Sequence, residues 1–164
     1  MRKTLEKMEN HSEWNLIAAK CQYQQYDNAV TVLLNDMCGG YEEITQKLSE
    51  KLACPVMLCY IYDGDYWGYY FYDKGMVLDC FNTMPDYFVK ISEEERQRLA
   101  GNSKIIAAYF DVEEAEIKND IQIWTDDILD SEDEIYAYSE DEFCMGENWQ
   151  MADFMRKIGY LYQW

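Results

Sequence analysis

Three aromatic-rich runs separated by turn residues constrain the fold of this chain more than any other feature. The first run covers residues 56–62 and is followed by the Asp-Gly-Asp turn at 63–65, and Asp-Gly is a strong signal for a hairpin. The second run covers 66–72 and is followed by Asp-Lys-Gly at 73–75, where glycine can take the left-handed position of a three-residue loop. The third run covers 76–81. The sequence therefore predicts an antiparallel three-stranded meander.

The second predicted strand carries aromatic side chains toward both faces of the sheet. Alternation places Trp67, Tyr69 and Phe71 on one face and Tyr66, Tyr70 and Tyr72 on the other. One face is expected to form the core. The other is either covered by a helix or open to a partner, because tyrosine and tryptophan favour interfaces.

Helices are predicted before and after the meander along the chain, over about 41–52, 92–100, 111–123 and 148–158. The first and last show apolar residues at helical spacing, and the middle two open with the capping-box patterns Ser-Glu-Glu-Glu at 92 and Asp-Val-Glu-Glu at 111. Strands followed by helices are typical of an α+β fold. The length of 164 residues favours a single domain over 1–164.

The N-terminal part predicts one or two further strands that extend the meander. Residues 29–34 (AVTVLL) form a strand-like run ahead of the first helix. A right-handed crossover would place this run parallel to residues 56–62. Alternatively, it pairs with residues 14–21 as a hairpin.

Composition narrows the function classes. Half of the residues are apolar, which excludes a disordered acidic tail, and 32 acidic against 14 basic residues leave a formal charge of -18. A nucleic-acid interface built on phosphate neutralisation is therefore not expected. We also expect no membrane partner, because neither a signal sequence nor a run of about 20 apolar residues is found. Of the six cysteines, Cys54, Cys59 and Cys80 lie in apolar, strand-like runs, which, without a signal sequence, favours reduced thiols and a cytoplasmic location.

No pattern predicts catalysis, a metal or a cofactor. His11 is the single histidine, and the acidic loop that begins at Asp130 lacks the glycine and the closing glutamate of an EF-hand. With 32 acids, some carboxylates lie close together in any fold, so a pair carries no information about an active site. We expect a protein that is not an enzyme.

An acidic tract between Lys118 and Arg156 is the strongest candidate for a binding surface. It contains no basic residue, and large apolar residues are interleaved with its acids. Such a surface can capture a basic protein rapidly by electrostatic steering. A face that only improves solubility is the alternative. The residues predicted to contact the partner are Asp126, Asp127, Asp130, Glu132, Asp133, Glu134, Tyr136 and Tyr138.

Residues 62–75 and 79–88 resemble a pattern in small acidic bacterial proteins: an aspartate turn, an aromatic strand, a glycine turn and a Pro-Asp-Tyr-Phe corner at 85–88. In size and acidity the chain also resembles the immunity proteins of bacterial polymorphic toxin systems. These are small cytosolic chains that neutralise a cognate, often basic, toxin by direct binding. The resemblance implies an immunity protein or similar inhibitor. The alternative is a small-molecule or carbohydrate-binding module that uses the aromatic sheet face.

Overall fold

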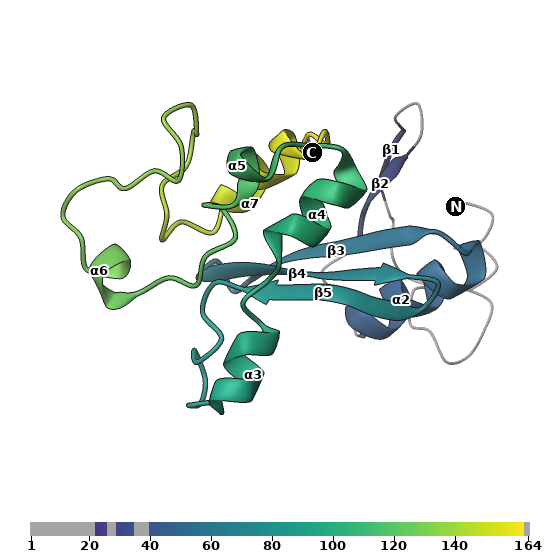
Figure 1. The fold of residues 1–164 in the computed structure, drawn as a ribbon, viewed down its shortest axis with the longest axis horizontal. Coiled ribbons are helices and arrows are strands. Elements are labelled where there is room, and N and C mark those ends of the chain that lie inside the picture. Colours follow the sequence, from purple (N-terminus) through teal and green to yellow (C-terminus); the bar gives the residue numbers. More distant parts are fainter. Residues whose placement is uncertain (1–21, 26–28, 35–39, 163–164) are drawn as a thin grey trace. The chain divides into compact units, whose positions relative to one another are not determined.

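The computed structural model describes residues 22–25, 29–34 and 40–162. Helices and antiparallel sheets confirm the α+β class (Figure 1). The chain forms two compact units. Unit 1 comprises the described residues up to Leu58 together with Phe71–Val77, and unit 2 comprises Cys59–Tyr70 together with the described residues from Leu78 onward. The single-domain organisation stays a prediction.

The predicted meander is confirmed as the strands β3 (Pro55–Tyr62), β4 (Tyr66–Asp73) and β5 (Met76–Asn82), in the order β3-β4-β5. The first turn has positive φ angles at Asp63 (49°) and Gly64 (84°), the conformation of a two-residue type I′ hairpin. A type I′ turn matches the right-handed twist of the two strands, and it needs residues that tolerate positive φ angles. Asp-Gly meets this need and therefore predicts a hairpin.

The second turn differs in length from the prediction. Lys74 and Gly75 have φ angles of 50° and 80°, so two residues connect β4 to β5 instead of three. In unit 1, helix α2 (Tyr41–Leu52) stabilises this turn: Gln46 Nε2 donates to Gly75 O at 2.8 Å, and Gly75 N donates to Ser49 Oγ at 3.3 Å.

The N-terminal strands do not extend the meander. Strand β1 (Gln22–Gln25) pairs antiparallel with β2 (Val30–Leu33), with Gln24 opposite Thr31, in a two-stranded sheet of their own. The parallel crossover is therefore wrong for the described strands. The antiparallel pairing of the hairpin alternative is present, but its first strand is at 22–25. Residues 14–21 lie outside the described part.

Three of the four predicted helices are confirmed, with slightly different ends. Helix α2 has the predicted bounds, α3 spans Glu93–Arg98 and α7 spans Gln150–Lys157. At α3 the predicted cap is present, because Ser92 Oγ accepts a hydrogen bond from Glu95 N at 3.1 Å.

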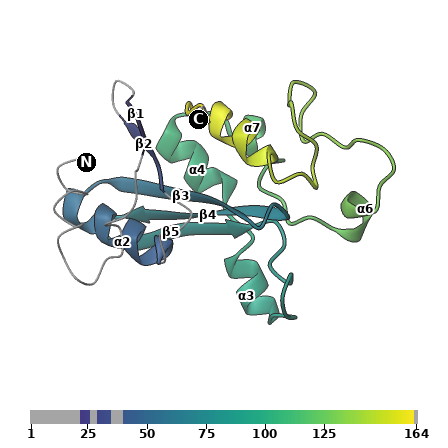
Figure 2. The same cartoon turned by 180° about the vertical axis from the view of Figure 1, so that it is seen from behind.

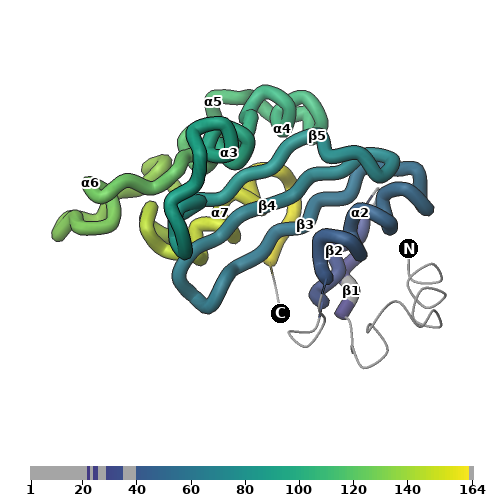
Figure 3. Tube along the Cα trace, turned by 90° about the horizontal axis from the view of Figure 1, so that it is seen from below, coloured from purple at the N-terminus to yellow at the C-terminus, as the bar shows by residue number. Residues whose placement is uncertain are grey.

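The helix predicted over 111–123 is wrong. Asp111 ends the helix α4 (Ser103–Phe110) with a left-handed φ of 55°, and only the short α5 (Glu114–Ile117) follows. The chain starts α4 at Asn102, whose side chain accepts a hydrogen bond from Lys104 N at 3.2 Å. Asp111 is therefore the C-cap of α4 and does not serve as the predicted N-cap. Helix α5 contacts both α4 and α7, whereas α6 (Asp126–Leu129) lies apart from them in a long loop (Figures 1 and 3).

Aromatic packing forms the core of unit 2. The ring of Phe154 on α7 lies 5.4 Å from Trp67 and 5.7 Å from Tyr69, so α7 packs against the part of β4 that belongs to unit 2 (Figure 2). On the opposite face Tyr66 is buried and Tyr70 is half buried. In unit 1, Phe71 and Tyr72 are buried as well. The aromatic side chains of β4 are therefore buried or half buried on both faces.

Candidate partner-binding surface

The six acidic residues predicted to contact a partner lie in α6 and in the loop that follows it. Backbone bonds from Ile128 N and Leu129 N to Thr125 O, at 2.9 and 3.0 Å, form the single turn of α6. Carboxylates in a first helical turn interact favourably with the free amide groups there. All six acidic side chains are exposed: Asp126, Asp127, Asp130, Glu132, Asp133 and Glu134.

A second segment folds back against this loop. Met145 N donates to Ile135 O at 2.7 Å, which places residues 144–147 beside residues 128–135. The returning segment turns at Gly146, whose φ is 92°, and Cys144 N donates to Glu147 Oε2 at 2.9 Å. The sequence analysis missed this segment. Gly146 is the signal that could have found it, since it is the one glycine in the acidic tract and marks a turn.

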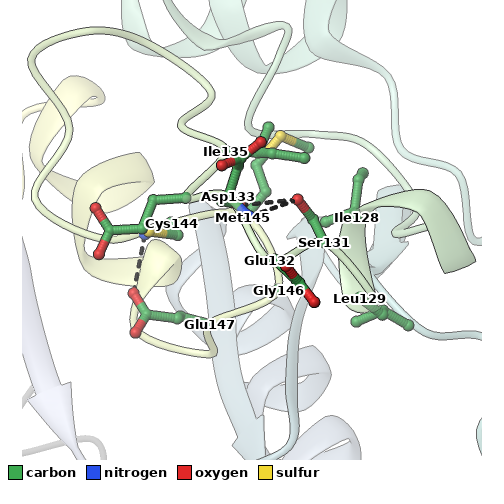
Figure 4. Close-up of a pocket in the computed structure, with 11 residues that line it drawn as sticks. Ile128, Leu129, Ser131, Glu132, Asp133, Ile135, Cys144, Met145, Gly146 and Glu147 are labelled. Carbon is green, nitrogen blue, oxygen red and sulfur yellow. Dashed lines mark hydrogen bonds between the residues drawn. The ribbon is translucent and has the colours of Figure 1, made fainter.

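The two segments enclose an open hollow of about 250 Å³ (Figure 4). Its lining combines apolar side chains with carboxylates, and we call it the acid-rimmed hollow. The lining residues are Ile128, Leu129, Ser131, Glu132, Asp133, Glu134, Ile135, Cys144, Met145, Gly146 and Glu147. None of these residues is basic.

This lining suits a lysine or arginine side chain from another molecule. Such side chains bury an aliphatic stem along apolar surface and keep a charged head in a polar environment. Ile128, Ile135 and Met145 offer the apolar surface, while Glu132, Asp133 and Glu134 offer anionic oxygens. Arginine can also bind a carboxylate through two parallel hydrogen bonds.

The two predicted tyrosine anchors have different environments. Tyr136 is 40% exposed, and its hydroxyl donates to Glu134 Oε2 at 2.9 Å. Its contact with the Cys144 thiol, and then that with Glu134, raises the pKa of Tyr136 above the usual range, so it stays a neutral donor. Tyr138 is half buried: Lys157 Nζ lies 4.0 Å from the centre of its ring, and its hydroxyl accepts from Asn119 N at 3.0 Å. Tyr138 therefore packs against Lys157 and Asn119 and is less exposed than Tyr136.

Three aspartates of the acidic tract are buried, although the sequence analysis places the tract on the surface. Lys157 Nζ lies 2.9 Å from Asp120 Oδ2 and 2.6 Å from Asp141 Oδ1. Arg156 Nη2 lies 2.6 Å from Asp153 Oδ1. We call these five side chains the buried ionic cluster after its three buried aspartates; Lys157 is 10% exposed and Arg156 is 41% exposed. Lys157 and Arg156 are on α7, so the cluster attaches the acidic loop to that helix.

The carboxylates of the cluster also bind loop backbone. Asp153 Oδ2 accepts hydrogen bonds from Glu142 N and Phe143 N, at 2.9 and 2.8 Å, and Asp141 Oδ2 accepts from Tyr138 N at 3.0 Å. Removal from water raises the pKa of Asp120 to about 7, against the opposing effect of Lys157. These bonds fix the backbone of the acidic loop at residues 138, 142 and 143.

No protein-family model, curated protein sequence or solved structure matches this chain. Among the described helices, none has the length and apolar character required to cross a membrane. In the described part of the chain, no group of three or more His, Cys, Asp or Glu side chains is arranged to hold a metal ion. Cys54, Cys59 and Cys144 are free thiols, and burial raises the pKa of Cys59 to about 12.

Proposed function

We propose that this protein binds a basic protein through the acid-rimmed hollow and thereby inhibits it, as an immunity protein or similar inhibitor does. One observation carries the proposal: the lining of the hollow combines apolar side chains with exposed carboxylates and contains no basic residue.

Charge supports a basic partner. The formal charge of -18 produces an attractive field for cations, which accelerates encounter. The exposed acids at Asp126, Asp127 and Asp130 extend this field beside the hollow. In such complexes, peripheral charges mainly increase the association rate, while side chains inserted in pockets determine how slowly the complex dissociates.

The conformation of the loop supports a rigid binding surface. The bond from Met145 to Ile135 and the buried ionic cluster hold the loop without a partner. A loop that is already ordered loses less conformational entropy on binding. This reduces the free energy that the partner contacts must supply.

The binding proposal is tested by capturing partners from the native host with the wild-type chain and with a variant in which the six exposed acids are neutralised. The variant is D126N, D127N, D130N, E132Q, D133N and E134Q. We expect the captured basic protein to bind the variant at least about tenfold more weakly at low salt.

A matched control separates the local surface from total charge. Neutralising six other exposed acids changes the net charge equally, from -18 to -12, and should leave binding nearly unchanged. The control set is Glu42, Glu93, Glu94, Asp111, Glu113 and Glu116. Equal binding by both variants and the wild type would refute the proposed surface, and the absence of any partner at all salt concentrations would refute the function.

Inhibition has its own test. The captured partner is produced in bacteria with and without this protein, and growth or the partner's activity is measured. We expect growth and survival only when the wild-type chain is present. A partner that binds but keeps full activity would contradict the inhibitor role while leaving binding intact.

A further inference from the structure

A cluster of aromatic rings lies at the β3–β4 turn, and we call Tyr62, Tyr66, Tyr87 and Phe88 the aromatic corner. The ring of Tyr62 stacks on Tyr66 at 5.3 Å between centroids and meets Phe88 edge-on at 5.1 Å. Tyr87 lies 5.1 Å from Tyr66 and 4.9 Å from Phe88. Four rings from two separate chain segments therefore form one continuous apolar surface.

This surface is exposed even though its base is buried. Tyr66 is only 6% exposed, whereas Phe88 and the adjacent Val89 are 67% and 68% exposed. Tyr62 and Tyr87 are each more than 40% exposed. Large apolar side chains that cluster on a surface mark interaction sites, and aromatic anchors dominate the energy of protein interfaces.

Polar contacts hold the corner in place. The Tyr87 hydroxyl donates a hydrogen bond to Asp65, and Ile91 N donates to Asp86 Oδ1 at 2.9 Å. Asp86 also forms an ion pair with Arg96 on α3. The exposed rings are thus fixed before any partner arrives, which lowers the entropy lost on binding.

One hydrogen bond links the aromatic corner to the chain segment that lines the acid-rimmed hollow. The side-chain amide of Asn148 donates to Gly64 O, in the turn that separates Tyr62 from Tyr66. Asn148 directly follows Glu147, which lines the hollow. Both sites belong to unit 2, and this bond connects the segments that carry them.

The charge of the chain favours a basic protein as the molecule that binds the aromatic corner. The exposed carboxylates of Asp63 and Asp65 flank the rings. A second copy of this chain, or an anionic lipid surface, would be repelled by a formal charge of -18. A basic protein is attracted by the same charge.

We propose that the aromatic corner is the apolar anchor region of the interface with the basic protein partner. This inference rests on the proposed function. The acids near the hollow attract and orient the partner, and the rings of the corner bury apolar side chains that flank the partner's lysines or arginines. Together they would give one interface with an apolar centre and a charged periphery, as in stable protein complexes.

The test uses the full chain labelled with ¹⁵N and two synthetic peptides with equal numbers of lysines. Leucines separate the lysines in one peptide and serines separate them in the other. We expect both peptides to shift the amide signals of residues 132–134 and 146–147. We expect only the leucine peptide to shift those of residues 62–65 and 87–89 as well. Replacing Phe88 and Val89 by threonine should weaken binding of the leucine peptide by about tenfold.

A matched control replaces Met76 and Val77, also exposed, at 65% and 51%, by threonine and should leave the peptide affinity unchanged. Shifts confined to the acidic residues would overturn the role of the corner but retain the proposed function. Shifts confined to the corner, or none at all, would overturn the proposed function and this inference with it. Shifts at the corner caused by phosphatidylcholine vesicles would overturn the inference and identify a membrane as the occupant. Shifts caused by raising the concentration of the protein alone would overturn it and identify a second copy.

Discussion

The ammonium group of Lys157 binds both carboxylate oxygens of Asp120, at 3.0 and 2.9 Å, across 37 positions of sequence. The Asp120 side chain is fully buried and that of Lys157 is 10% exposed. Asp141 approaches the same ammonium at 2.6 Å. Lys157 therefore pairs with two buried carboxylates, and Arg156 Nη2 lies 3.8 Å from the second.

Replacing Lys157 by methionine should destabilise the protein strongly. Asp120 and Asp141 would stay buried without this cation, and breaking a buried ion pair in this way costs about 3–5 kcal/mol. The free energy of unfolding in urea measures the effect. The control K104M removes an exposed lysine from the same unit and should change stability by less than about 0.5 kcal/mol. Equal losses in both variants would contradict a structural role for the cluster.

The stability contributed by Asp120 should decrease as pH rises from about 4 to about 7. Burial raises the pKa of Asp120 to about 7 in the folded state, while an unfolded aspartate titrates near its ordinary value of about 3.9. The folded state therefore binds this proton more tightly, and that advantage is complete below pH 4 and is lost by pH 7. The difference in unfolding free energy between wild type and D120N measures it. A difference that grows with pH would show that pairing with Lys157 outweighs burial.

Replacing Gln150 by leucine should destabilise the core of unit 2. Gln150 Oε1 accepts hydrogen bonds from the indole N–H groups of Trp67 and Trp124, at 3.2 and 3.3 Å. Leucine would leave both buried donors unsatisfied, at a cost of about 1–3 kcal/mol or more. Thermal unfolding monitored by tryptophan fluorescence measures this loss. The control Q97L changes an exposed glutamine that bonds to Glu93, and it should have little effect. A stable Q150L protein would show that water replaces the lost acceptor.

Two glycine substitutions separate backbone strain from crowding. Gly101 and Gly159 have left-handed φ angles of 72° and 92°, so alanine is strained at both, by about 1–2 kcal/mol. At Gly101 a Cβ atom would also lie 2.4 Å from Ile121 Cγ2, whereas at Gly159 no heavy atom lies within 4 Å. We expect G101A to lose about 1–3 kcal/mol more than G159A in chemical denaturation. Equal losses would mean that Ile121 moves aside without cost.

Local patterns predict the meander and three helices correctly because their signals act over a few residues. The Asp-Gly and Lys-Gly turns adopt left-handed angles that these residues tolerate, and the Ser92 cap forms with Glu95 as expected. The helix predicted from Asp111 is wrong because α4 already ends at this residue, whose left-handed φ of 55° differs from the extended backbone of an N-cap.

The sequence by itself determined the acidic, aromatic character of this protein, the strands of the sheet and the six exposed acids predicted to contact a partner. Only the tertiary structure decided that Asp120, Asp141 and Asp153 are buried and that Met145 and Glu147 complete the hollow. The physical reason is that burial of a carboxylate depends on a cation from a distant segment. That cation is Lys157 for Asp120, and no local pattern encodes their contact.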